Sequence, residues 1–136
     1  QASDVYKRQA QDAGALDDAL RFASAAMALR PDWLPTSFQV HRALSLAGRQ
    51  AEANLLGRQL AAKHPDDRLV AFNVGTALYS SGSLDEAVPL LERALALEPR
   101  DARAAHQLAQ AHRQRREHAR AAELFERATQ LDPQFA

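Results

Sequence analysis

Apolar residues recur at helical spacing through most of the chain. Between Arg68 and Arg100 two such stretches stand on either side of Gly82, and Pro99 follows the second. Apolar positions three and four residues apart indicate amphipathic α-helices, whereas glycine and proline interrupt them. The pattern therefore predicts two helices joined by a tight turn and ended by a proline.

The same spacing in residues 16–29 predicts another helix. It would begin near Leu16 and place Asp17 and Asp18 in its first turn, where negative charge suits the positive end of the helix dipole. Pro31 would stop it, because proline restricts the residue before it and cannot continue the hydrogen-bond ladder.

The pattern repeats with a period of 34 residues. The prolines at this interval are Pro31, Pro65, Pro99 and Pro133. An alanine twelve residues before each proline forms a second column: Ala19, Ala53, Ala87 and Ala121. A third column holds Gly14, Gly48 and Gly82, with Arg116 in the fourth place. A fixed period of this length predicts a repeat array, here a single array over 1–136 with units at about 1–33, 34–67, 68–101 and 102–135.

The residues in these columns resemble the tetratricopeptide repeat, in bacterial-type arrays. The third unit carries Ala71, Val74, Gly75, Leu78, Ala87, Leu91, Ala94 and Pro99, and the fourth carries Ala105, Leu108, Ala109, His112, Ala121, Phe125, Ala128 and Pro133. The resemblance implies an all-α fold, a right-handed α-solenoid of antiparallel helix pairs with a concave groove that holds a partner's peptide or helix. Two departures, His41 and Gly57, make the second unit the least regular internal one.

Local signals add detail to the predicted helices. Ser83 and Glu86 form a capping-box pattern, in which each side chain would satisfy a free backbone amide. Pro89 lies in the second turn of the same helix, where we expect a slight bend without a break. Asp32 and the Asp66-Asp67 pair each follow a proline and are candidate N-caps.

Both ends of the chain point to a fragment. Residues Asp4 to Gln9 read DVYKRQ, which resembles a translated sequencing adaptor; the alternative is a genuine first helix with Val5 and Tyr6 on one face. After Pro133 there is no polar capping helix of the kind that repeat arrays carry at their ends. We therefore expect Leu124 and Phe125 to be partly uncovered.

Composition restricts the function without naming it. Lys plus Arg number 17 and Asp plus Glu number 17, so the net charge is zero and no overall field favours nucleic acid or a membrane. There is no cysteine, which removes disulfides, thiolate nucleophiles and cysteine metal sites and is compatible with a cytoplasmic location. The apolar runs are too short to span a bilayer.

The sequence shows no pattern typical of an enzyme or of a cofactor site. None of the five histidines pairs with another at a spacing of three or four, and neither a phosphate-binding glycine loop nor a G-x-S-x-G motif is present. Acidic pairs that begin helices are explained by capping. We therefore predict no catalytic residue, no metal and no cofactor.

The resemblance places the functional surface on the inner face of the first helix of each unit. The groove residues predicted in this way are Phe38, Arg42, Phe72, Asn73, Thr76, Tyr79, Arg103, His106, Gln107, Gln110 and Arg113. Chaperone-binding members hold a peptide carboxylate with two Lys, two Asn and an Arg. Those places carry Phe38, Arg42, Asn73, Arg103 and Gln107 here, so only Asn73 and the charge of Arg103 match.

Arginines, amides and aromatics in one groove favour an acidic-hydrophobic peptide as the ligand. The alternative for each residue, Phe72 above all, is packing between neighbouring helices. A separate basic cluster around the last inter-helix turn, Arg113, Arg115, Arg116, His118 and Arg120, can bind an acidic partner or be a solvated surface.

Two functions remain open from the sequence. The first is a protein–protein interaction scaffold that binds a partner peptide or helix in its groove and has no chemistry of its own. The second is the accessory array of a larger bacterial enzyme, since similar arrays precede glycosyltransferase or sulfotransferase domains.

Overall fold

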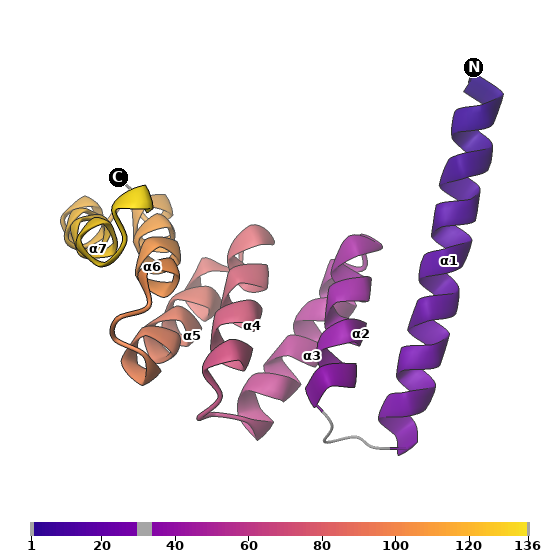
Figure 1. Ribbon diagram of the computed structural model, residues 1–136, viewed down its shortest axis with the longest axis horizontal. Coiled ribbons are helices and arrows are strands. Elements are labelled where there is room, and N and C mark those ends of the chain that lie inside the picture. The colour runs from indigo at the N-terminus through magenta and orange to yellow at the C-terminus, as the bar shows by residue number, and fades with distance from the viewer. Residues whose placement is uncertain (1, 30–33, 136) are drawn as a thin grey trace. The chain divides into compact units, whose positions relative to one another are not determined.

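The structure is a computed structural model that describes residues 2–29 and 34–135 (Figure 1). The described residues are helical, with short turns and no strand. The elements are α1 (Ala2–Leu29), α2 (Leu34–Leu46), α3 (Gln50–Lys63), α4 (Arg68–Ser80), α5 (Leu84–Leu97), α6 (Ala102–Gln114), α7 (His118–Leu131) and the 3₁₀ turn η1 (Pro133–Phe135). The predicted all-α class is confirmed.

The chain forms two compact units, Gln1–Leu56 and Gly57–Ala136, and the boundary falls within α3. The first unit contains α1, which packs on α2, and the start of α3. The single array with four units of 34 residues stays a prediction.

Helix α1 differs from the expectation. The predicted start near Leu16 is wrong, because one continuous helix of 28 residues begins at Ala2. Asp17 and Asp18 therefore lie well inside the helix, and Asp4 occupies the first turn instead. Gly14, the counterpart of two turn glycines, is also helical, since glycine tolerates a helix interior at a cost of only about 1 kcal/mol. Pro31 and Asp32 lie outside the described residues, as does the side chain of Ala19.

The second unit is built from helix pairs. Helix α4 packs against α5, α6 packs against α7, and α5 also contacts α6 (Figure 1). Alanines of the predicted column are buried here: Ala87 is 0% exposed and Ala121 is 3% exposed, and Ala53 of the first unit is 0% exposed. Small side chains at these positions let helix backbones approach closely. The expectation for Leu124 is wrong, because it is 1% exposed, whereas Phe125 is half-buried.

Three helices end in the same hydrogen-bonded turn. In α4, the amide of Gly82 donates to the Tyr79 carbonyl and the amide of Ser83 donates to the Leu78 carbonyl. The same pair of bonds closes α2 at Gly48 and α6 at Arg116. This is the Schellman arrangement, which needs a left-handed residue after the C-cap. Gly48 and Gly82 supply it at φ 76° and 84°, whereas Arg116 adopts φ 63° with a full side chain.

The helix starts confirm one expectation and overturn another. The Asp67 carboxylate accepts from the amides of Leu69 and Val70, so Asp67 is the predicted N-cap of α4. The capping box is wrong: Ser83 makes no side-chain cap, and the Glu86 carboxylate accepts from Arg58 instead. A bidentate guanidinium partner is a stronger donor than a single backbone amide. Helix α5 runs through Pro89 without a break.

Candidate functional site

The predicted groove residues of the fourth unit lie on one stripe of α6. Asp101 caps this helix by accepting from the amides of Arg103 and Ala104. The opposite side of the helix is buried through Leu108 and the alanines around it. At about 100° per residue, the remaining positions fall within roughly 120° of one another. We call this stripe the α6 face; its residues are Arg103, His106, Gln107, Gln110 and Arg113.

At the start of the α6 face, Arg103 lies over Phe72 of α4. The guanidinium carbon is 4.8 Å from the ring centroid. Phe72 is 8% exposed, so its ring is largely a packed side chain, as the alternative interpretation expected. Its contact with Arg103 nevertheless fixes the position of an exposed cation, since a guanidinium is attracted to the face of an aromatic ring.

At the other end of the face, Arg113 lies over Phe125 of α7, 5.6 Å from the ring centroid. His106 contacts the same phenylalanine edge-on, with ring centroids 5.5 Å apart. His106 also lies 5.0 Å from the ring of Phe135 in η1. Gln110 Nε2 is 3.0 Å from His106 Nε2, which orients the imidazole further. A small aromatic cluster therefore fills the space between the two arginines.

Sequence reasoning missed Phe125 and Phe135 as parts of this surface. Phe125 was expected to be partly uncovered at the end of the array, but not to form part of the groove. Phe135 follows Pro133, where no helix was predicted. No spacing signal would have found Phe135, because its position depends on how the chain turns at η1.

The other predicted groove residues have mixed positions. On α4, Asn73 is exposed, whereas Thr76 and Tyr79 are half-buried. On α2, in the first unit, Arg42 is exposed and Phe38 is half-buried. Among the groove residues predicted outside α6, Phe72 contacts the α6 face, through Arg103.

Three polar atoms near the α6 face are buried without a hydrogen-bond partner: Thr76 Oγ1, His106 Nδ1 and Gln107 Oε1. An unpaired buried polar atom costs about 1–3 kcal/mol. Among the described residues these three atoms stay unpaired beneath the surface.

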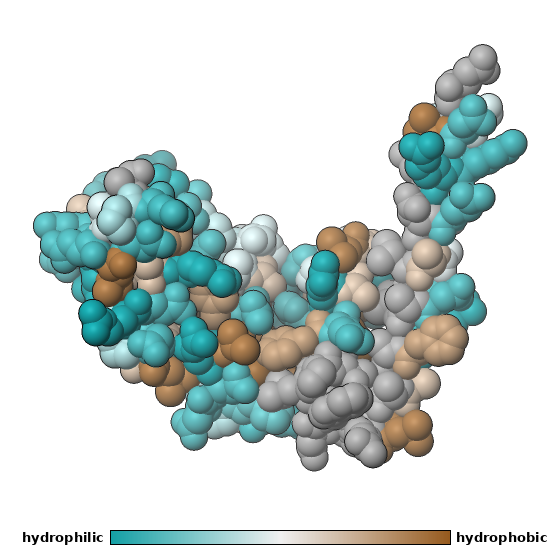
Figure 2. All heavy atoms as spheres, in the orientation of Figure 1, coloured by the Kyte–Doolittle hydropathy of each residue, from teal (hydrophilic) through white to brown (hydrophobic). Residues whose placement is uncertain are grey.

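The basic cluster at the α6–α7 turn is partly neutralised. Glu117 accepts from Arg115 at 2.9 Å and contacts His112 Nδ1 at 3.0 Å. Arg120 pairs with Glu123 at 3.3 Å. Over α6 and α7 the visible surface is mostly hydrophilic, with isolated hydrophobic side chains (Figure 2). The cluster therefore has the features of a solvated surface, with Arg113 held over Phe125.

The described residues contain no group of three or more His, Cys, Asp or Glu side chains placed to hold a metal ion. In residues 2–29 and 34–135, no helix combines the length and the apolar character that a membrane span requires.

Comparison with solved structures gives the same fold. A structure titled MamA AMB-1 is 26% identical, with a TM-score of 0.77, and the match covers 88% of this chain and 66% of that one. An RS-1 MamA double mutant is 24% identical, with a TM-score of 0.80, and 96% and 73% of the two chains are covered. MamA from Desulfovibrio magneticus RS-1, from residue 41 to its end, is 19% identical with a TM-score of 0.77, covering 91% and 70%.

The chain thus spans just under two thirds of the first of these structures. No curated protein sequence matches it significantly. The tetratricopeptide repeat matches residues 42–97 and again residues 75–134. These two overlapping matches cover more than half of the chain and together run from within α2 to beyond the end of α7. The chain therefore belongs to the tetratricopeptide repeat family and has the fold of a protein-interaction scaffold.

Proposed function

We propose that this chain binds an acidic-hydrophobic segment of a partner protein along the α6 face. The observation that carries the proposal is the pair of arginines at its two ends. Arg103 and Arg113 are both exposed, and within the described residues neither forms an ion pair with an acidic side chain. Each is held over an aromatic ring.

The spacing of the two arginines fits a peptide. They are ten residues apart on one helix, which at 1.5 Å per residue is about 15 Å. An extended segment covers that distance with about five residues, at roughly 3.3 Å per residue. Guanidinium groups bind carboxylates through two parallel hydrogen bonds, and the aromatic cluster between them offers contact for an apolar side chain.

The remaining predicted groove residues extend this proposal. Asn73, Tyr79 and Gln107 would hydrogen-bond the backbone of the bound segment. Phe38 and Arg42 of α2 belong to the other unit, so their contribution to peptide binding is proposed and tested separately.

The experiment is a binding titration with a fluorescein-labelled peptide containing two glutamates around a central leucine. The control peptide has glutamine in place of each glutamate. The variant Arg103→Glu with Arg113→Glu reverses both anchors, and we expect affinity to fall at least about tenfold, or 1.4 kcal/mol. Arg42→Glu separately tests the prediction for α2.

Arg100→Glu, in the loop before α6, is the control because Arg100 is exposed and lies outside the α6 face. It should bind like the parent chain. Equal affinity of the double variant and the parent would overturn the proposal, as would equal affinity for the glutamate and glutamine peptides.

A further inference from the structure

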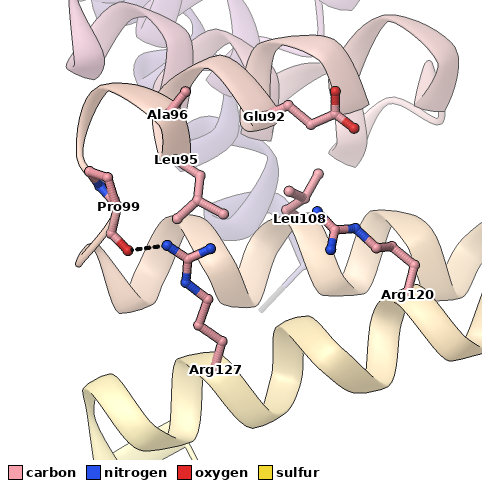
Figure 3. A pocket seen from close by; sticks show the side chains of 7 residues that line it. All are labelled: Glu92, Leu95, Ala96, Pro99, Leu108, Arg120 and Arg127. Atoms are coloured by element: carbon pink, nitrogen blue, oxygen red, sulfur yellow. Dashed lines mark hydrogen bonds between the residues drawn. The ribbon is translucent and has the colours of Figure 1, made fainter.

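A pocket of about 440 Å³ lies between α5 and α7, with α6 as its floor (Figure 3). Its lining residues are Glu92, Leu95 and Ala96 of α5, Pro99, Leu108 of α6, and Arg120 and Arg127 of α7. Leu95 and Leu108 are buried, whereas Ala96 and Pro99 are exposed at the rim. The volume is at the lower end of the range of ligand sites, roughly 300–1,000 Å³.

This pocket is separate from the α6 face. Leu108 is two residues from both His106 and Gln110, which is about 200° around a helix. The floor of the pocket therefore lies on the opposite side of α6. A ligand in the pocket would touch none of the side chains used in the proposed function.

The repeat register explains why the pocket is open. One period earlier, Arg58 and Glu86 occupy the places of Glu92 and Arg120, with their charges exchanged. Arg58 Nη2 donates to Glu86 Oε1 at 2.8 Å, and this contact lowers the pKa of Glu86. The bridge joins α3 to α5 across the corresponding gap.

Glu92 and Arg120 form no such bridge. Glu92 Oε1 lies 3.9 Å from His112 Nε2, and Arg120 pairs with Glu123 on its own helix. The two long side chains that are bridged across one gap thus form no bridge across the next.

The charge of the open pocket favours an anionic partner. Two guanidinium groups line it against one carboxylate, and Arg127 has no acidic partner among the described residues, whereas Arg120 pairs with Glu123. Arg127 Nη2 donates to the Pro99 carbonyl at 2.7 Å, as Figure 3 shows, which fixes this side chain at the rim and leaves other donors of its guanidinium for a ligand. Ala96 and Pro99 at the exposed rim offer contact for an apolar group, because Leu95 and Leu108 beneath them are buried.

We infer that this pocket is a second interaction site, which takes an aliphatic side chain of a partner protein and binds an adjacent acidic side chain through Arg127. The inference is independent of the proposed function, because it uses a different surface. The apolar and the cationic lining groups together suit a Leu-Glu dipeptide within a longer segment.

The test uses ¹⁵N-labelled protein and three short peptides in a Gly-Ser background, containing Leu-Glu, Leu-Gln or Ala-Glu. We expect saturable shifts of the Leu95, Ala96 and Leu108 amide signals with the Leu-Glu peptide. Removing either the carboxylate or the aliphatic side chain should weaken binding by about tenfold. If these amides show no saturable shift with the Leu-Glu peptide, the inference is overturned.

Variants with register-matched controls locate the site. Ala96→Trp would fill the pocket from its exposed rim and abolish the shifts, whereas Ala62→Trp, one period earlier, should leave them unchanged. Arg127→Gln should remove the preference for Leu-Glu over Leu-Gln. Arg93→Gln is its control, since Arg93 lies one period earlier and donates to the Ala61 carbonyl at 3.3 Å.

Two further outcomes would reject the inference. The first is equal loss of binding in Ala96→Trp and Ala62→Trp. The second is a concentration-dependent dimer in sedimentation that Ala96→Trp dissociates, which would identify the occupant as another copy of this chain. Binding to the α6 face should be unaffected by Ala96→Trp, so failure here and failure of the proposed function are distinguishable.

Discussion

Gly75 of α4 lies directly against Leu91 of α5. A Cβ atom at position 75 would stand 3.0 Å from Leu91 Cγ and 3.1 Å from Leu91 Cδ2, and 3.3 Å from the Cβ of Leu90. Leu91 is 0% exposed and is enclosed by the core, so it has little room to move away. The glycine is therefore required by the close approach of two helices.

Gly75→Ala should lower the free energy of unfolding by about 1 kcal/mol. Alanine is the better helix former by about 1 kcal/mol, but crowding a packed core costs about 1–3 kcal/mol. Urea denaturation measures the difference. Gly14→Ala is the control, because a Cβ at that helical position meets nothing within 4 Å. Gly14→Ala should stabilise the chain. Stabilisation by Gly75→Ala as well would contradict the close contact between Gly75 and Leu91.

Leu91→Ala should cost about 2–5 kcal/mol, because it opens a cavity in the core. The double variant with Gly75→Ala should lose less than the sum of the two single changes, since the new methyl group enters the vacated space. A double-mutant cycle in urea measures this coupling, which for residues in contact is about 0.5–3 kcal/mol. Strict additivity would show that the two side chains do not meet.

Arg116→Gly should raise the stability of the chain by up to about 1 kcal/mol. Arg116 has φ 63°, and a left-handed backbone costs residues with a Cβ about 1–2 kcal/mol, partly offset by the greater freedom of glycine in the unfolded chain. The midpoint of thermal unfolding should rise. The reverse change at the equivalent turn, Gly82→Ala, should lower it, and a fall in both variants would contradict the explanation.

Asp101 has two roles that substitutions can separate. Its carboxylate caps α6 and also lies 3.2 Å from Arg68 Nη1. Asp101→Ala should cost about 1 kcal/mol through the lost cap, whereas Asp101→Asn keeps a capping oxygen and should cost only a few tenths. Thermal unfolding of both variants tests this order. Equal losses of stability in the two variants would show that the missing negative charge, and not the missing cap, causes the effect.

His41 should make stability depend on pH. Burial lowers its pKa below the ordinary 6.5, because the charged imidazole is poorly solvated inside the protein. The unfolded chain therefore takes up the proton at a higher pH than the folded chain does. The contribution of neutral His41 is fully present above about pH 6.5 and decreases as the pH falls towards its folded pKa.

His41→Gln should remove this part of the pH dependence. Urea midpoints between about pH 7.5 and pH 5.5 measure it, and the difference between the two proteins isolates His41 from other titrating groups. His118→Gln is the control, since His118 is exposed. Identical pH slopes in His41→Gln and the parent chain would show that His41 does not contribute.

Much of the fold could be predicted because the period repeats the same local requirements. Buried Ala87 and Leu91, the N-cap at Asp67 and the turn at Gly82 each follow from a residue type in a repeated position. The start of α1 could not be predicted in this way. Gly14 occupies the same repeat position as the turn glycines Gly48 and Gly82. Glycine permits a helix as well as a turn, and the neighbouring structure decides between the two conformations.

The candidate site was less accessible to sequence reasoning. Register alone placed Arg103 and His106 on one face, but their contacts with Phe72 and Phe135 depend on tertiary packing. The capping box failed for a related reason. Glu86 has the correct spacing from Ser83, but Arg58, 28 residues away in sequence, offers a charged partner that no local pattern reveals.

The exchange of charge between Arg58–Glu86 and Glu92–Arg120 has a consequence for assembly of the chain. Ala53, Ala87 and Ala121 occupy equivalent positions in successive hairpins, so these columns alone do not distinguish one junction from the next. If α3 skipped α5 and met α7, Arg58 would oppose Arg120, and two cations in place of an ion pair would disfavour that mispairing. The exchanged charges therefore favour the contact of α3 with α5 over that mispairing.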